Sequence, residues 1–388
     1  LGNDRVFFNG QLQENAFLST YSLNGVQVIN GQVQRTLSEV RVPNPTFTWE
    51  IANNANLGLE GALLNNKLFF EFDIFNNQRR QILIQRAGST AQSSGITNLL
   101  PPVNEGKVEN KGFEFRVGYN GRVNDLTFTA SVNGGYAKNK VLFWDENPGT
   151  PEHQRATGHS FGTSGFAFLA YQYDGVFKDA AEIAANKIDY SAAESNLRPG
   201  DMKFKDISGP DGKPDGKITA LDQVRMDKTR DPVFTGGLNL NVAYKNFDLS
   251  ALFQGAAGGL QLLRFNETGE FGNWLQYSYN NRWSVQNPSS EHPRLVSREN
   301  RYYTSNFRNN TYWLRSNDYL RFKNFELGYT VGASVSQRLG ISRFRVYVSG
   351  LNLITWDKLG IWDPEETAEN GYVYPQARII STGVRITF

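Results

Sequence analysis

Apolar and polar residues alternate along most of the chain with a period of two. In the run that follows Asn65 and Asn66, one face is apolar at Leu68, Phe70, Phe72 and Ile74. Such alternation is typical of β-strands with one apolar side, and paired runs joined by short turns predict β-hairpins. Nine runs of this kind predict strands over 53–64, 67–80, 110–120, 125–139, 234–244, 247–258, 318–331, 343–354 and 378–388.

One of these strands carries a break in its alternation. Leu320 and Phe322 are in the opposite phase to the apolar positions Phe325 and Leu327 that follow them. A slip of one residue at Lys323-Asn324 would bring the two halves of the strand into one phase. A β-bulge is the usual cause of such a slip, so we expect a bulge at this point.

The connections between the predicted strands fall into two classes that alternate along the chain. The short ones lie at 65–66, 121–124, 245–246 and 332–342. The long ones are polar and cover roughly 81–109, 141–233, 259–317 and 355–377. Short turns that alternate with long loops are typical of an antiparallel outer-membrane β-barrel, with the turns on the periplasmic side. A soluble adhesin of stacked sheets is the alternative, although soluble domains rarely carry loops this long.

The number of strands indicates that the barrel is incomplete in this sequence. Bacterial single-chain barrels close with an even number of strands, and this chain supplies nine. We therefore expect part of a barrel wall, whose outer strands 53–64 and 378–388 pair with strands from elsewhere. Leu1 is not a start residue, and no signal peptide opens the sequence. The predicted organisation is an extracellular segment at 1–52, four strands at 53–140, an extracellular excursion at 141–233 and five strands at 234–388.

Composition narrows the class of protein further. The 388 residues include 40 Lys and Arg and 38 Asp and Glu, a formal charge of +2 that gives no sign of a nucleic-acid partner. Cysteine is absent and histidine occurs three times, so thiolate chemistry is excluded and a histidine-built metal centre is not expected. Aromatic residues make up 13% and glycine is abundant, which favours an all-β chain with many turns.

The alternation also predicts which face of each strand meets lipid. An Arg on the lipid face at mid-bilayer costs about 2–4 kcal/mol, so Arg345, Tyr347 and Ser349 should face the lumen. The apolar positions of the strands should then face lipid, as at Phe113/Phe115/Val117, Leu238/Leu240/Val242 and Phe344/Val346/Val348.

Several stretches, in this order and spacing, resemble one family. They are LGNDRV, FLSTYS, NPTFTWEIANNANLGLEGALLNNKL, GKVENKGFEFRVGY, NKVLF, YQYDGVF, LRPGDMKFKDISGPDGKPDGKITALD, PVFTGGLNLNVAYKNFDLSALFQG, NDYLRFKNFELGYTV, LGISRFRVYVSGLNLITW, DPE and YPQARIISTGVRITF. Together they resemble the C-terminal part of SusC/RagA-type TonB-dependent outer-membrane transporters of Bacteroidetes.

This resemblance implies a barrel of 22 strands that encloses an N-terminal plug. It also implies a SusD-like surface lipoprotein that caps the barrel, and import of glycans or peptides that is driven by TonB. The plug, the TonB-contacting segment and the first part of the barrel are expected outside these 388 residues.

An Asp- and Gly-rich segment, 206–222, is the sharpest local motif. Read from Asp211, it places acidic residues and a glycine at spacings that calcium-binding loops use. Lys213 at the third position and an Asp rather than Glu at the twelfth depart from that pattern. The candidate calcium ligands are Asp206, Asp211, Asp215 and Asp222. The alternative is a tight turn with solvated aspartates.

Other candidate sites lie in the loops and at the C-terminus. Trp274, Trp283 and Trp313 are candidates for contact with a substrate or a partner, since flat rings stack on sugars and anchor interfaces. Packing within the loops is the alternative for each. Phe388, preceded by Val384 and Ile386, resembles the end signal of outer-membrane barrel proteins. A short helix is possible within Ala180–Ala193, most simply as a packing element.

No set of catalytic residues is recognisable, so we do not expect an enzyme. The predicted function is part of a TonB-dependent transporter in the outer membrane, which imports oligomeric nutrients together with a SusD-like lipoprotein. The alternative is a transporter-like barrel that serves as a structural component of a secretion or biogenesis assembly.

Overall fold

The computed structural model describes residues 7–8, 11–12, 18–86, 88–90, 92–96, 99–163, 165–263, 276–288, 291–295, 307, 309–338, 340–366 and 374–388. The chain divides into two compact units. One comprises 1–55, 75–111 and 139–161, and the other comprises 56–74, 112–138 and 162–388. The sites described below lie in the second unit.

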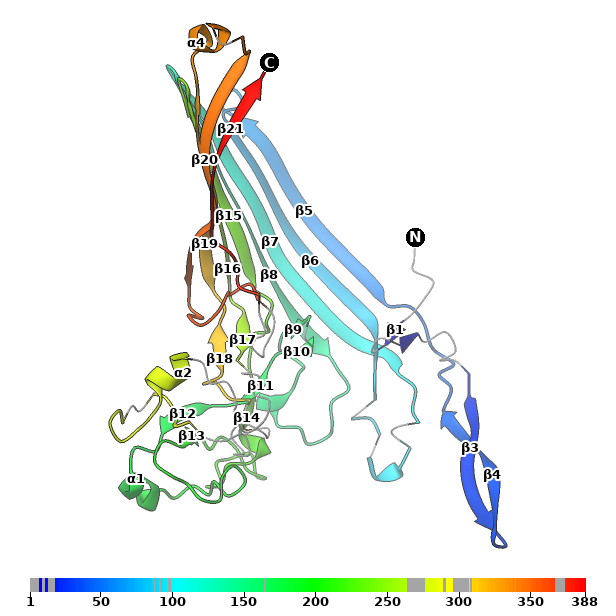
Figure 1. The fold of residues 1–388 in the computed structure, drawn as a ribbon. Coiled ribbons are helices and arrows are strands. Elements are labelled where there is room, and N and C mark those ends of the chain that lie inside the picture. Colours follow the sequence, from blue (N-terminus) through cyan, green and yellow to red (C-terminus); the bar gives the residue numbers. More distant parts are fainter. Residues whose placement is uncertain are drawn as a thin grey trace. The chain divides into compact units, whose positions relative to one another are not determined.

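Nine strands form the main sheet in the described part of the chain, and all nine were predicted from the alternation (Figure 1). Their order in the sheet is β21-β20-β19-β16-β15-β8-β7-β6-β5. The strands are β5 (Ile51–Leu63), β6 (Leu68–Ile84), β7 (Val103–Val123), β8 (Leu126–Phe143), β15 (Phe234–Tyr244), β16 (Phe247–Ala257), β19 (Tyr319–Thr330), β20 (Arg343–Asp357) and β21 (Ile379–Thr387). Strands β5 and β21 are the two edges, so among the described residues the sheet does not close on itself.

The predicted bulge lies in β19. Leu252 of β16 is opposite Asn324, whereas the next residue, Phe253, is opposite Phe322. Lys323 is therefore the extra residue that the pairing skips, and the same slip separates Phe322 from Asn324 in the pairing with β20. The bulge brings Leu320 and Phe322 into one phase with the apolar positions beyond it, which confirms the sequence interpretation.

The strand registers sort the side chains of the second unit onto two faces. Directly opposed residues share a face, and one row runs through Val242, Leu249, Leu327 and Val348. The adjacent row on the other face runs through Asn241, Ser250, Glu326 and Ser349. The sheet thus has an apolar face and a polar face, and large side chains such as Leu238 and Val346 are exposed on the apolar one.

Short elements make up the rest of the described chain. The strands are β1 (Phe7–Phe8), β2 (Gln11–Leu12), β3 (Thr20–Ile29), β4 (Gln32–Arg41), β9 (Phe161–Gly162), β10 (Gly165–Phe166), β11 (Leu169–Tyr171), β12 (Tyr173–Val176), β13 (Met202–Phe204), β14 (Gln223–Arg225), β17 (Leu260–Leu262) and β18 (Leu314–Ser316). The α-helices are α1 (Ala180–Ala185), α2 (Gln276–Asn281) and α4 (Ala333–Arg338), and 3-10 turns lie at Gln92–Ser94, Glu152–Gln154 and Ala220–Asp222. In the part of the chain that the structure describes, no helix has the length and apolarity needed to cross a membrane.

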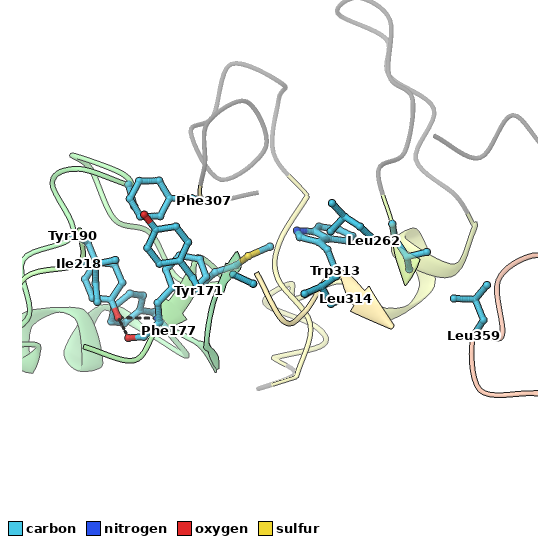
Figure 2. Close-up of a cluster of buried hydrophobic side chains, with 14 residues drawn as sticks. Tyr171, Phe177, Tyr190, Ile218, Leu262, Phe307, Trp313, Leu314 and Leu359 are labelled. Carbon is cyan, nitrogen blue, oxygen red and sulfur yellow. Dashed lines mark hydrogen bonds between the residues drawn. The ribbon is translucent and has the colours of Figure 1, made fainter. Parts of the chain in front are cut away.

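The elements between β8 and β15 and between β16 and β19 share a hydrophobic core, and we call this region the loop module. Its buried residues come from segments far apart in sequence, such as Tyr171 and Phe177 from one loop and Trp313 from the other (Figure 2). Helix α1 begins after Asp179, whose side chain accepts a hydrogen bond from the Glu182 N–H at 2.8 Å. It ends at Ala185, so it covers only the first half of the predicted helical segment.

Candidate functional site

The polar face of the sheet carries an ion cluster around Arg345. Its Nε donates to Asp248 Oδ1 at 3.0 Å, and its Nη2 donates to Glu326 Oε1 at 2.7 Å. A further ion pair joins Nη2 to Asp248 Oδ2. Arg345 is only 5% exposed, and its guanidinium lies over the backbone of Gly328, where a larger side chain would collide with it. The three charged groups therefore hold β16, β19 and β20 together on the polar face.

A second cluster surrounds Arg321 near the other end of β19. Its Nη1 donates to Glu365 Oε2 at 2.5 Å, and its Nη2 donates to Asp363 Oδ2 at 2.6 Å. The hydroxyl of Tyr319 also donates to Glu365, at 2.8 Å, and Thr355 accepts from Arg321 Nε at 3.1 Å. Arg321 is fully buried, so its charge is satisfied entirely by these partners. The cluster fastens the loop that follows β20 to the sheet.

The sequence predicted Arg345 on the polar face of its strand but gave no indication of either cluster. The partners of Arg321 are about 40 residues away in sequence. The phase slip at Lys323 already puts Arg321 on the polar face, which is the one signal that marked it. A polar wall with fixed charges can contact a polar solute or another protein segment by hydrogen bonds and ion pairs.

The core of the loop module is built largely from aromatic rings. Tyr171 stacks on Phe307 with ring centroids 4.5 Å apart, and Phe177 meets Tyr190 edge-on at 5.4 Å. The Tyr190 hydroxyl donates to the carbonyl oxygen of Phe204 at 3.0 Å. Burial raises the pKa of Tyr190 to about 12, so the hydroxyl remains a donor at physiological pH.

A buried ion pair joins two loops of the module. The Nε of Arg294 donates to Asp201 Oδ1 at 2.6 Å, and the N–H of Arg198 donates to Oδ2 at 2.8 Å. Burial raises the pKa of Asp201, and the hydrogen bond from Arg294 opposes that shift. Gly200 lies beside this pair at a φ of +90°, with the Trp283 ring packed where its side chain would be.

The predicted calcium segment is a folded loop in which the aspartates bond to the backbone. Asp222 is fully buried and accepts from the N–H groups of Ile207, at 2.7 Å, and Thr219, at 2.6 Å. Asp206 accepts from the N–H of Gly216 at 2.7 Å. Within the described ranges, no three acidic or histidine side chains are gathered as metal ligands would be.

Aspartates that accept backbone hydrogen bonds, as Asp206 and Asp222 do, are typical of a structured turn, which is the alternative to a calcium site. The geometry of this segment does not bring Asp206, Asp211, Asp215 and Asp222 together as a ligand set. Calcium binding by this segment stays a prediction.

The three candidate tryptophans differ in position. Trp313 is 4% exposed and belongs to the core of the loop module, which favours its packing role. Trp283 packs on Gly200 and is partly exposed, so a partner contact by this ring stays a prediction. Trp274 lies outside the described residues.

An unforeseen group of polar and aromatic side chains lies at the edge of the loop module. Arg315 lies over the Tyr312 ring, 5.2 Å from its centroid, and His292 Nδ1 is 3.0 Å from the Tyr312 hydroxyl. Burial lowers the pKa of His292, and the charge of Arg315 lowers it further. The sequence did not mark this group, because Arg315 and His292 belong to no motif.

The C-terminal Phe388 follows β21 directly and is largely exposed. β21 pairs with β20 from Ile379 to Thr387, and the N–H of Ser342 donates to the Thr387 carbonyl at 2.8 Å. The last described strand therefore ends one residue before Phe388. Its role in targeting stays a prediction.

Comparison with known proteins shows which proteins this chain resembles. No family model matches the chain. Among curated proteins, TonB-dependent receptor P3 of Formosa agariphila is 29% identical over 398 residues, which cover 96% of this chain and 37% of that protein. TonB-dependent receptor P26 of the same organism is 26% identical over 96% of this chain. This chain resembles a TonB-dependent outer-membrane receptor of the SusC/RagA type.

Solved structures agree with this receptor fold. The RagAB peptide transporter matches with a TM-score of 0.64 and 22% identity, over 96% of this chain and 38% of that one. The RagAB peptide importer in its 'open-open' state matches with a TM-score of 0.65. At this level of identity the match shows the fold of the receptor wall.

The receptor fold explains the two faces of the sheet. A transmembrane barrel is apolar toward lipid and polar toward its lumen, so the apolar face described above is the lipid face. The protein is located in the outer membrane. The chain spans about two fifths of the length of the curated receptors that it matches, which is consistent with a sheet that still has two edges.

Proposed function

We propose that this chain forms part of the wall of an outer-membrane transporter that imports oligomeric nutrients, either glycans or peptides. The polar face of the sheet supports this proposal, because it lines a lumen with hydrogen-bonding groups and fixed charges such as the Arg345 cluster. The similarity to proteins named TonB-dependent receptors supports import that is driven by TonB. The plug and the TonB contact would belong to the remainder of the receptor.

The observation that carries the proposal is the combination of a lipid-facing sheet with a folded loop module. A barrel that only anchors an assembly needs the sheet but has no need of a folded loop module. The loop module adds a packed core between β8 and β15 and between β16 and β19, where long loops would otherwise cost ordering entropy. A packed module at the long-loop end of the strands is suited to receive a SusD-like lipoprotein, which is the proposed partner.

Uptake by intact cells tests this function. Cells that carry the full receptor should accumulate fluorescent oligopeptides or oligosaccharides, and loss of TonB should abolish the accumulation. The native complex, purified in mild detergent, should retain a surface lipoprotein. Absence of TonB-dependent uptake for both classes of oligomer, together with absence of a lipoprotein, would favour the structural-barrel alternative.

A further inference from the structure

A groove crosses the apolar face of the sheet close to the short turns. It is an open hollow of about 470 Å³, and the large apolar residues among those that line it include Phe247, Leu327, Tyr329, Val346, Val348 and Val384. The registers place Phe247, Tyr329, Val346 and Val384 in one row across four neighbouring strands. The groove therefore runs across β16, β19, β20 and β21 at a fixed height above the turns.

The surface of this groove is suited to hydrocarbon. Phe247 and Val384 are more than half exposed, and the Phe247 and Tyr329 rings lie 4.8 Å apart at its rim. Aromatic rings at this height match the girdle that outer-membrane barrels place at the membrane interface. A hollow of this kind on a lipid-facing wall can take a segment of an acyl chain.

The turns beside the groove carry an excess of positive charge. Their segments 64–67, 121–125, 244–247 and 331–343 contain one acidic residue, Asp125. The basic residues of the same segments, all of them exposed, are Lys67, Arg122, Lys245, Arg338 and Arg343. We call these five residues the basic rim, and its net charge with Asp125 is +4.

Lys245 is the member of the basic rim with the closest relation to the groove. Its Nζ lies 5.3 Å from the centroid of the Tyr244 ring, and Tyr244 belongs to the apolar face. Lys245 is two residues before Phe247, which opens the groove. Arg343 begins β20 three residues before Val346, and its Nη2 donates to Thr330 Oγ1 at 3.5 Å, so its charge lies on the polar side of the basic rim.

From this juxtaposition we propose that the groove and the basic rim bind an anionic phospholipid of the leaflet that the short turns face. One acyl chain lies along Phe247, Tyr329 and Val346, and the phosphate lies near Lys245. Bacterial barrels place their short turns toward the periplasm, so the leaflet is the periplasmic one. Basic side chains at a membrane surface attract anionic lipids, which supplies the charge complementarity.

Native mass spectrometry of the full receptor in detergent tests the site. Phosphatidylglycerol and phosphatidylcholine with identical acyl chains are added separately, and the retained lipid is counted at each concentration. Phosphatidylglycerol should be retained at lower concentration. Lys245→Gln should weaken its retention about fivefold, because one cation near an anionic membrane surface contributes about 1 kcal/mol.

Matched variants separate the two parts of the site. Lys187→Gln, at an exposed position between β12 and β13, should leave retention unchanged. Val348→Trp fills the groove with an apolar ring on the lipid face and should reduce retention of both lipids.

Three results would overturn the proposal. They are equal retention of the two lipids, a Lys245→Gln variant that matches Lys187→Gln, or full retention by Val348→Trp. Displacement of the lipid by an equal concentration of glycerol 3-phosphate would show head-group binding alone and would also contradict it.

Discussion

Replacing Arg321 by methionine should release the loop that follows β20 while leaving the sheet folded. The change keeps the volume of the side chain and removes the cation that Asp363 and Glu365 share. Arg321 belongs to β19, but its backbone pairing with β16 and β20 does not depend on the guanidinium. The perturbation is therefore directed at the loop anchor.

The size of the effect follows from the burial of the three groups. Breaking a fully buried ion pair costs about 3–5 kcal/mol, because one charge is left without a partner. The side chains of Asp363 and Glu365 are 14% and 25% exposed, so both carboxylates can reach water once the loop moves. We therefore expect a smaller cost, about 2–3 kcal/mol, paid as local opening of the loop.

Hydrogen exchange of the full receptor measures this opening. The N–H groups of Glu365 and Glu366 bond to Asp363, and their exchange should accelerate roughly 30- to 150-fold in Arg321→Met. Lys358→Met is the matched control, since it removes an exposed ion pair with Asp318 at the start of the same loop. An exposed pair contributes at most about 1 kcal/mol, so exchange should rise less than about fivefold. Equal exchange in the two variants would refute the proposed anchor.

Four further predictions test other parts of the structure. Leu240→Arg should destabilise the receptor in bilayers by about 2–4 kcal/mol in urea titrations, whereas Asn241→Arg, on the polar face, should cost far less; equal costs would contradict the assignment of faces. The pKa of His292 is lowered, so the stability that its neutral ring gives to the contact with Tyr312 is full above about pH 6.5 and is lost as the pH falls below that value. Proteolysis of the loop module should therefore speed up at low pH, and His292→Gln should abolish this pH dependence. Gly200→Ala should speed cleavage of the loop module by chymotrypsin more than Gly212→Ala does. Both alanines would have a positive φ that costs about 1–3 kcal/mol, but only the alanine at 200 would collide with a packed ring, so equal cleavage rates would refute the contact with Trp283. If segment 206–222 binds calcium, chelation should expose it to proteolysis, and unchanged protection would count against an ion.

The strands could be predicted because the membrane imposes a two-residue period on the sequence. Lipid and lumen sort alternate side chains, so Leu238, Leu240 and Val242 mark β15 without any knowledge of its neighbours. The bulge at Lys323 was visible for the same reason, since a one-residue slip reverses the phase.

The loop module and the ion clusters could not be predicted in the same way. Tyr171 packs on Phe307, and Arg321 binds Asp363, across separations that no local pattern records. The calcium motif shows that a clear local pattern can also fit more than one structure. Its spacing of acidic residues is also a spacing that lets Asp206 and Asp222 accept backbone hydrogen bonds in a tight loop.

Lipid exposure of alternate residues tests the central claim, that this chain is a membrane-facing barrel wall, most directly. The chain has no cysteine, so single cysteines at successive positions of 236–243 can be spin-labelled in the full receptor and reconstituted in bilayers. The account predicts collision with oxygen at Leu238, Leu240 and Val242, and collision with a water-soluble nickel complex at Asn239 and Asn241. Uniform exposure to the nickel complex along the strand, or the opposite phase, would contradict it.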